Sequence, residues 1–301
     1  MRRFLIVAPF AALGFLAFEA ASQSSVVSEL APGVFFRLGD RDRRQPANCG
    51  WIIFNDYVFV IDANYPWGAR EILPEIKKTT SKPIRFIFDT HYHGDHAQGN
   101  SLFVDAGAAV VCSEECAAES RSKGQAAWDK STETGEFSLK PYRLAHPSIV
   151  FGDGMVFDDG VHRVELKRMG PGHTRGDAVA YLPKEKILFT GDLCVNWTSG
   201  NFAGDADANH PGWVRALGEM ARWDVRTVVP GHGGIGSTDT LRAQQGYLDD
   251  LWKQAAAGRR SGKAAEELAK QLDLSRHGNF AASAPSNAAT IRAMYQKAGN
   301  Y

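Results

Sequence analysis

The chain has 301 residues, of which 44% are hydrophobic, a composition typical of a packed globular protein rather than a disordered or fibrous one. Lys plus Arg balance Asp plus Glu at 34 each, so the formal net charge is zero. Because the chain has no basic excess and no runs of Lys and Arg interleaved with aromatic residues, we expect it to bind no nucleic acid.

The first 22 residues form a segment of their own. A basic start at Met1-Arg2-Arg3 precedes an apolar run from Phe4 to Phe18, and small residues at Ala20-Ala21-Ser22 follow. This pattern predicts a signal peptide over 1–22 and a secreted or periplasmic mature protein. The alternative is a membrane anchor, but the run is shorter than the roughly 20 residues of a spanning helix. We therefore expect no stable membrane span once the signal is removed.

Four cysteines, Cys49, Cys112, Cys116 and Cys194, are an even number in a chain with an export signal. One or two disulfides are possible in an oxidising compartment, and Cys112 and Cys116, which match no C-x-x-C motif, are interpreted as structural. The sequence leaves the pairing open.

The first half of the chain is rich in predicted strands. Short β-prone segments lie at 34–38, 50–54 and 57–61, and Asn55-Asp56 separates the last two as a hairpin turn. A helix is expected over 67–78, and an apolar strand over 84–88 then leads directly into a histidine-rich loop. These elements predict a sheet that carries the loop at one strand end.

The same alternation of strands and helices continues to the C-terminus. Ser113 is the expected N-cap of a helix after a strand at 108–112, and residues 124–147 are expected to be irregular. Helices are expected over 213–223 and from 238 onward. Further strands are expected at 155–157, 161–166, 177–182, 187–190 and 227–230. Strands followed by helices occur twice, which predicts two sheets packed face to face with helices outside.

The histidine-rich loop, His91-Tyr-His-Gly-Asp-His96, contains four side chains of the types that bind metals. His91 and His93 can point to the same side of an extended turn, and Gly94 allows a bend that directs Asp95 and His96 to a second point. Histidine combined with carboxylate suits zinc in open, water-bearing sites. One loop could therefore serve two metal ions.

Three more candidate ligands follow predicted strands and stand beside glycine. They are His173 in MGPGHTRGD, Asp192 in ILFTGDLC and His232 in TVVPGHGG. Each alone has an ordinary explanation, such as a turn cap or a hydrogen bond to backbone. Together with the histidine-rich loop they indicate a metal site.

The motifs THYHGDH, GPGHTRGD, FTGD and VPGHG, in this order and at these separations, resemble the metal motifs of the metallo-β-lactamase superfamily of hydrolases. The resemblance covers roughly residues 26–235. It implies an α/β (α+β) fold, a four-layer αββα sandwich with a two-metal site at one edge. We expect a catalytic domain over 23–236 and a C-terminal helical extension over 237–301, which covers the pocket, mediates a dimer or completes the outer layer.

The resemblance also implies which residues hold two Zn²⁺ ions per chain. The expected ligands are His91, His93 and His173 for one ion, Asp95, His96 and His232 for the other, and Asp192 as the bridge. Asp62 matches an acidic residue kept near the site in that family, and a simple turn cap is an equally open explanation for it.

Two zinc ions predict hydrolysis of an ester-like or amide-like bond. Zinc lowers the pKa of bound water from about 16 to about 7, so a bridging hydroxide can attack a carbonyl of a small-molecule substrate. We expect Asp95 to be catalytic, because its carboxylate can orient that hydroxide and move its proton.

The substrate class is less tightly determined. The best-known lactamase subclass has cysteine in place of Asp192 and a lysine in place of Val195 for the substrate carboxylate. A β-lactam is therefore one expected substrate, and a lactone, ester or thioester, as in the lactonase and glyoxalase II branches, is the alternative. His93 favours zinc over iron redox chemistry because iron members commonly carry glutamate there. A silent metal-binding protein would be expected to lose ligands, and none is lost.

The pocket is expected beside Tyr65 to Trp67 and the segment 196–213. Trp67, Trp197 and Phe202 could form an apolar wall, and Asn201 and Asn209 could donate hydrogen bonds to a substrate. His210 is expected at a turn before a helix that starts at Pro211. Cys194 is expected to face the core, because on an extended strand it would point away from the side of Asp192.

Overall fold

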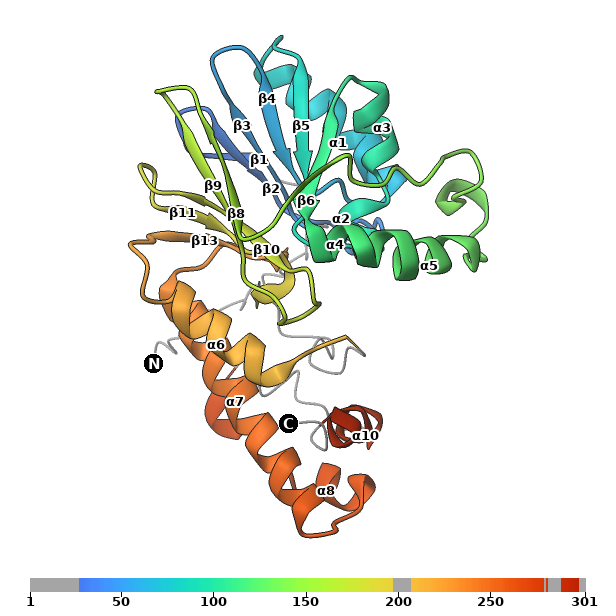
Figure 1. Cartoon of the computed structure of the whole chain (residues 1–301), viewed down its shortest axis with the longest axis vertical. Coiled ribbons are helices and arrows are strands. Elements are labelled where there is room, and N and C mark those ends of the chain that lie inside the picture. The colour runs from blue at the N-terminus through green and yellow to red at the C-terminus, as the bar shows by residue number, and fades with distance from the viewer. Residues whose placement is uncertain (1–26, 197–206, 279, 281–287, 298–301) are drawn as a thin grey trace, which may run out of the picture.

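A computed structural model describes residues 27–196, 207–278, 280 and 288–297. Two β-sheets face each other, and helices cover both outer faces (Figure 1). The seven-stranded sheet has the order β1 (Val27–Ala31), β2 (Val34–Arg37), β3 (Cys49–Ile53), β4 (Val58–Ile61), β5 (Ile84–Phe88), β6 (Ala109–Ser113) and β7 (Ile149–Phe151). The five-stranded sheet has the order β13 (Thr227–Val229), β11 (Ile187–Phe189), β10 (Ala178–Leu182), β9 (Arg163–Arg168) and β8 (Gly154–Asp158). A small parallel pair, β12 (Val195–Asn196) and β14 (His232–Gly233), lies beside them.

The helices lie in two groups along the chain, one before β7 and one after β11. The first group comprises α1 (Pro66–Thr79), α2 (Gly94–Ala97), α3 (Asn100–Asp105), α4 (Glu114–Glu119), a π-helical turn (Ser120–Gly124), α5 (Gln125–Asp129) and a 3₁₀ turn (Gly135–Phe137). The second comprises a 3₁₀ turn (Gly191–Leu193), α6 (His210–Met220), α7 (Thr238–Arg260), α8 (Ala265–Gln271), a 3₁₀ turn (Ser275–His277) and α10 (Ala288–Lys297).

Three hydrophobic clusters correspond to the three interfaces of a four-layer sandwich. The side chains of β4 show how alternation builds two of them: Phe59 and Ile61 enter the cluster between the sheets, whereas Val58 and Val60 pack under α1 and α3. Fully buried Phe59 alone contributes about 1.5–3 kcal/mol. The expected four-layer α/β architecture is confirmed.

The third cluster joins the outer face of the five-stranded sheet to the C-terminal helices. Val179 and Tyr181 of β10 pack against α6 and α7, and residues of α8 and α10 extend the same cluster. Helix α7 begins with a capping box at Ser237. The C-terminal helices therefore extend the outer layer on this side, and none of the helices that the structure describes has the length and apolarity to cross a membrane.

Several local expectations are confirmed and others are wrong. Ser113 caps α4 by accepting a hydrogen bond from the Cys116 amide. The segment 124–147 is only partly irregular, because α5 continues the helix that starts with α4. His210 is no turn residue: it opens α6, is buried, and stacks on Trp252 with ring centroids 5.2 Å apart.

No disulfide forms among the four cysteines, all of which lie in the described part of the chain as free, buried thiols. Cys49 and Cys194 belong to different hydrophobic clusters. Cys112 and Cys116 share a small fourth cluster, where the Cys112 thiol donates to the Ser113 carbonyl at 3.1 Å. The four cysteines therefore contribute to the fold as buried apolar side chains and not as cross-links.

Candidate metal centre

The parallel strands deliver the candidate ligands to one edge of the sandwich. In the seven-stranded sheet β4 and β5 run parallel, and in the five-stranded sheet β11 and β13 do so. The carboxyl ends of parallel strands meet at the same sheet edge, so the loops that follow these four strands converge there. His173 arrives from the loop between β9 and β10.

All seven residues singled out as ligands are brought together at this edge. Their donor atoms form three overlapping groups, in each of which the atoms lie within 4.8 Å of one another. The groups are His91, His93 and His173; His91, His96 and Asp192; and Asp95, His96 and His232. We call the first the three-histidine group and the last the mixed group.

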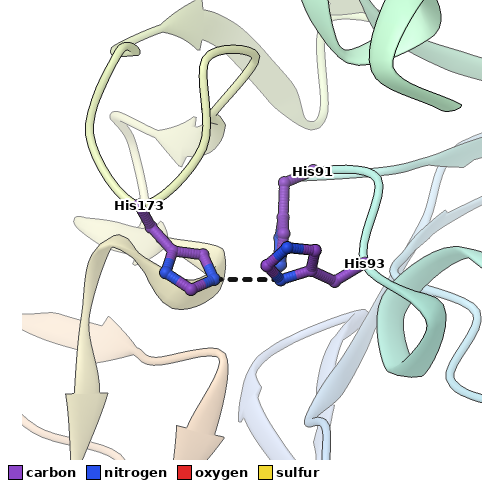
Figure 2. A group of neighbouring side chains, drawn as sticks. All are labelled: His91, His93 and His173. Carbon is purple, nitrogen blue, oxygen red and sulfur yellow. Dashed lines mark hydrogen bonds between the residues drawn. The ribbon is translucent and has the colours of Figure 1, made fainter. Parts of the chain in front are cut away.

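In the three-histidine group the ring nitrogens converge on one point (Figure 2). The Nε2 atom of His173 lies 3.1 Å from Nδ1 of His93. The Thr90 hydroxyl lies 3.1 Å from Nδ1 of His91 and thereby directs Nε2 of His91 into the cluster. That Nε2 atom is buried without a hydrogen-bond partner among the described residues. A buried imidazole nitrogen left in this way fits a metal ligand, because an unsatisfied buried polar atom is otherwise costly.

In the mixed group a carboxylate joins two imidazoles. Nε2 of His96 lies 3.3 Å from Nε2 of His232, and Oδ2 of Asp95 lies 3.4 Å from the latter atom. Asp95 and His96 stand on the single turn α2, whose N-cap is His93. The turn therefore places neighbouring residues of one loop into two different groups.

Asp192 lies between the two groups. Its Oδ2 is 3.5 Å from Nε2 of His173, and its Oδ1 is 3.2 Å from Nε2 of His96 and 3.1 Å from that of His232. A Cβ on Gly231 would lie 2.0 Å from Asp192 Oδ1, so the glycine before His232 is needed for this close approach.

The imidazole of His96 is held by Asp62. Oδ2 of Asp62 lies 2.8 Å from Nδ1 of His96 and also accepts from the Thr90 hydroxyl, while Oδ1 accepts from the Thr90 amide. Asp62 has a φ of 60°, a left-handed conformation that Asp and Asn tolerate better than most residues. Orientation of His96, rather than a simple turn cap, is what the Asp62 carboxylate provides.

The imidazole of His232 is held by a loop far away in the sequence. The Pro46 carbonyl lies 2.9 Å from Nδ1 of His232. The buried amide of Asn48 brackets the same segment, donating to the carbonyls of Pro230 and Gly233 at 2.8 Å each, while its Oδ1 accepts from the Gly39 amide. Asn48 thus fixes the backbone on both sides of His232.

The loop that carries His173 is clamped from α4 and from within. The Glu119 carboxylate accepts from the Gly176 amide at 3.1 Å, and the Ser113 hydroxyl donates to the Gly176 carbonyl at 2.7 Å. Within the loop, the Asp177 carboxylate accepts from both the amide and the hydroxyl of Thr174. These contacts fix the residues that follow His173.

The electrostatics of the two groups differ in sign. Burial, with His96 and His93 nearby, holds the pKa of His91 well below its ordinary value. Burial also opposes charge on His96, but the carboxylates of Asp192, Asp62 and Asp95 outweigh it and raise the pKa of His96 well above the usual range. For Asp192, burial would raise the pKa, yet His232 and His96 hold it well below normal.

Other residues expected near the pocket have mainly structural contacts. Trp67 is buried, donates to the Arg44 carbonyl and stacks on Tyr65, and the side chain of Asn209 caps α6 by accepting from the Gly212 amide. Cys194 is buried in the core as expected, but Asp192 lies in a 3₁₀ turn, so strand alternation is not the reason. Trp197, Asn201, Phe202 and the signal segment 1–22 lie outside the described residues.

Sequence reasoning missed the residues that orient the ligands. Thr90 adjoins His91, and a hydroxyl directly before a predicted ligand is a local signal that could have been used. Pro46 and Asn48 give no such signal, because their partners lie more than 180 positions later. Tyr92, whose hydroxyl donates to the Asp207 carboxylate beside the site, was likewise missed.

A four-layer α/β sandwich with a His and Asp cluster at its strand ends has the features of a metal-binding protein. A family model of the metallo-β-lactamase superfamily matches residues 42–232, and the chain therefore belongs to that superfamily. The metallo-β-lactamase IND-1 of Chryseobacterium indologenes is 25% identical over 191 residues, which cover 62% of this chain and 71% of that protein. The type 2 metallo-β-lactamase of Elizabethkingia meningoseptica is 25% identical over 193 residues, or 62% and 68% of the two chains.

Solved structures share the fold. A metallo-β-lactamase from Pontibacter korlensis aligns with a TM-score of 0.63 at 24% identity, covering 75% of this chain and 99% of that chain. The metallo-β-lactamase DIM-1 aligns with a TM-score of 0.59 at 20% identity over 75% and 97% of the two chains.

Proposed function

We propose that this protein is an exported hydrolase that binds two Zn²⁺ ions. The three-histidine group would hold one ion and the mixed group the other, with Asp192 shared between them. The observation that carries the proposal is the position of Asp192, whose two carboxylate oxygens lie within 3.5 Å of imidazole nitrogens from both groups. The apolar run near the N-terminus supports the export part of the proposal.

Zinc in such a site would lower the pKa of water and polarise an oxygen of the substrate. Around it, Thr90 and Asp62 fix the tautomers of His91 and His96 so that both present Nε2. The side chain of Asp95 is 19% exposed, against 11% for that of Asp192, which also lies within 3.5 Å of three imidazoles. Asp95 is therefore the carboxylate that can reach substrate, and its Oδ2 is the atom proposed to orient the attacking water and accept its proton.

The bond cleaved is proposed to be amide-like or ester-like, with two candidate substrate classes. The names of the curated relatives, both metallo-β-lactamases, support a β-lactam. The departures at Asp192 and Val195 support a lactone or thioester: Val195 is buried in the β12–β14 pair, so no cation stands at that position.

The test is a paired measurement on the purified protein. Metal content per chain is determined, and initial rates on a chromogenic β-lactam, a lactone and a thioester are compared with and without a chelator. Two zinc ions and chelator-sensitive turnover of at least one substrate are expected. Iron in place of zinc, or turnover that survives complete metal removal, would overturn the proposal.

A further inference from the structure

A cavity of about 380 Å³ adjoins the loop that carries His173. Its lining residues are Glu115, Arg168, Pro171, Arg175, Asp207 and Asn209. The amide of Asn209 donates to the Gly172 carbonyl at 2.7 Å, so one wall of the cavity is fastened directly to this loop.

One lining residue of the cavity contacts the histidine-rich loop. Asp207 in its wall accepts a hydrogen bond from the Tyr92 hydroxyl, and the Tyr92 ring packs on His93 with centroids 4.7 Å apart. Tyr92 stands between His91 and His93 in the sequence. The cavity wall is thus linked to His93 through Tyr92 and Asp207, and Arg175 of its lining stands two residues after His173 in the same loop.

Three of the four charged side chains in the cavity wall are neutralised by neighbours. Arg168 pairs with Asp153 at 3.0 Å and with Glu115 at 3.6 Å. Asp207 pairs with Lys123. These pairs leave Arg175, which is exposed and makes no hydrogen bond or ion pair with any residue in the described part of the chain.

The other cations around the centre are already engaged. Lys123 contacts both Glu119 and Asp207, and Arg44 pairs with Glu133. Across the site, Val195 offers only a backbone amide, which donates to Gln244. Arg175 is therefore the guanidinium near the candidate metal centre that remains available to a ligand, among the residues that the structure describes.

We propose that Arg175 binds a carboxylate of the substrate and makes this cavity a subsite for acidic substrates; the inference rests on the hydrolase function proposed above. A guanidinium presents two parallel N–H donors that match a carboxylate. The paired acids Glu115 and Asp207 do not oppose such a ligand strongly, because each already has a cationic neighbour. Arg175 acts in this proposal as a specificity residue and leaves the chemical step unchanged.

The experiment uses two matched substrate pairs, each an acid and its methyl ester: benzylpenicillin and its ester, and a γ-lactone carboxylic acid and its ester. In the zinc-loaded Arg175→Gln variant, KM for the hydrolysed acid should rise about tenfold, with kcat and the KM of the ester unchanged. Arg175→Lys should restore part of the loss, because it returns the charge without the planar fork. The matched control is Arg85→Gln at the start of β5, far along the chain from the cavity lining. Arg85 is also exposed and makes no hydrogen bond or ion pair with any residue that the structure describes.

A second readout separates this inference from the hydrolase proposal. Calorimetric titration of the zinc-loaded protein with each acid and ester measures binding whether or not the ligand turns over. About tenfold weaker binding of the acid by Arg175→Gln, with ester binding intact, is expected even if hydrolysis fails for both pairs. Equal effects on acid and ester, or no effect on either, would overturn the role of Arg175 while leaving the hydrolase proposal in place.

Discussion

The three-histidine group and the mixed group lie side by side but are built differently. The three-histidine group consists of imidazoles alone, and the pKa of His91 is held low by burial and by its histidine neighbours. In the mixed group, burial is outweighed by Asp192, Asp62 and Asp95, which raise the pKa of His96. His91 is thus prepared to receive a cation as a neutral ligand, whereas His96 must first release a proton.

The two groups also differ in how the chain supports them. His91 is oriented by Thr90, and the loop between β9 and β10 that carries His173 is held by Glu119 of α4. His96 and His232 depend on Asp62 at the end of β4 and on the loop around Pro46 and Asn48. Changes on one side should therefore affect one ion more than the other, which makes the comparison testable.

The largest effect is expected where the groups share a residue. Asp192→Ala should reduce turnover by more than about 100-fold, because it removes a proposed ligand of both ions. The loss of a residue that only orients a metal ligand typically costs about 10- to 100-fold. Zinc content should fall from two ions to about one per chain, while circular dichroism shows a folded protein. Retention of two tightly bound ions together with full activity would contradict the bridging role of Asp192.

Asp62→Asn should weaken the mixed group selectively. Asn tolerates the φ of 60° and keeps an acceptor for the Thr90 amide, but its NH₂ group would face Nδ1 of His96. His96 would then favour the tautomer that carries its hydrogen on Nε2. The Nε2 atom, which faces the centre, could then no longer bind a metal. Zinc affinity of this group should fall about 10- to 100-fold by competitive chelator titration, with the other ion retained. Asp56→Asn, at an exposed turn, is the control, and equal weakening of both ions would rule out this tautomer argument.

The part of the centre that the sequence revealed is the part encoded locally. His91 to His96 are contiguous, and His173, Asp192 and His232 stand beside glycines at strand ends, where Gly231 is required by its contact with Asp192. The layers followed from alternation, as in β4 and β10. Contacts of long sequence separation gave no pattern: Asn48 could not be connected to Pro230 before the fold placed them together. The sequence left the state of the cysteines open for a similar reason, because the cluster to which each belongs depends on tertiary packing.

Asn48→Ala should have a smaller effect on the same group. It leaves the carbonyls of Pro230 and Gly233 without their donor, which should cost about 1–3 kcal/mol of unfolding free energy in a denaturant titration. Looser backbone around His232 should weaken zinc binding by the mixed group about tenfold. Asn196→Ala is the matched control, since that amide donates to the nearby Gly234 carbonyl at an exposed position and should change stability by about 0.5 kcal/mol or less. Equal losses in the two variants would show that Asn48 has no special relation to the centre.

The smallest expected effect comes from pH, and its sign follows from the pKa shifts. In the metal-free protein the raised pKa of His96 keeps that imidazole protonated at neutral pH, whereas the lowered pKa of His91 keeps its imidazole neutral. Zinc must displace the His96 proton, so lowering the pH by one unit below that pKa should weaken the mixed group by up to about tenfold. His91 adds no such dependence to the three-histidine group. Calorimetric zinc titrations in two buffers of different ionisation enthalpy count the released protons. The His173→Ala variant leaves the mixed group to be measured alone, and the His232→Ala variant leaves the three-histidine group. The carboxylates that would attract the zinc ion of the mixed group also stabilise the proton on His96 that this ion must displace. If zinc binding releases no more protons from the mixed group than from the three-histidine group, then Asp62, Asp95 and Asp192 do not set the charge of His96.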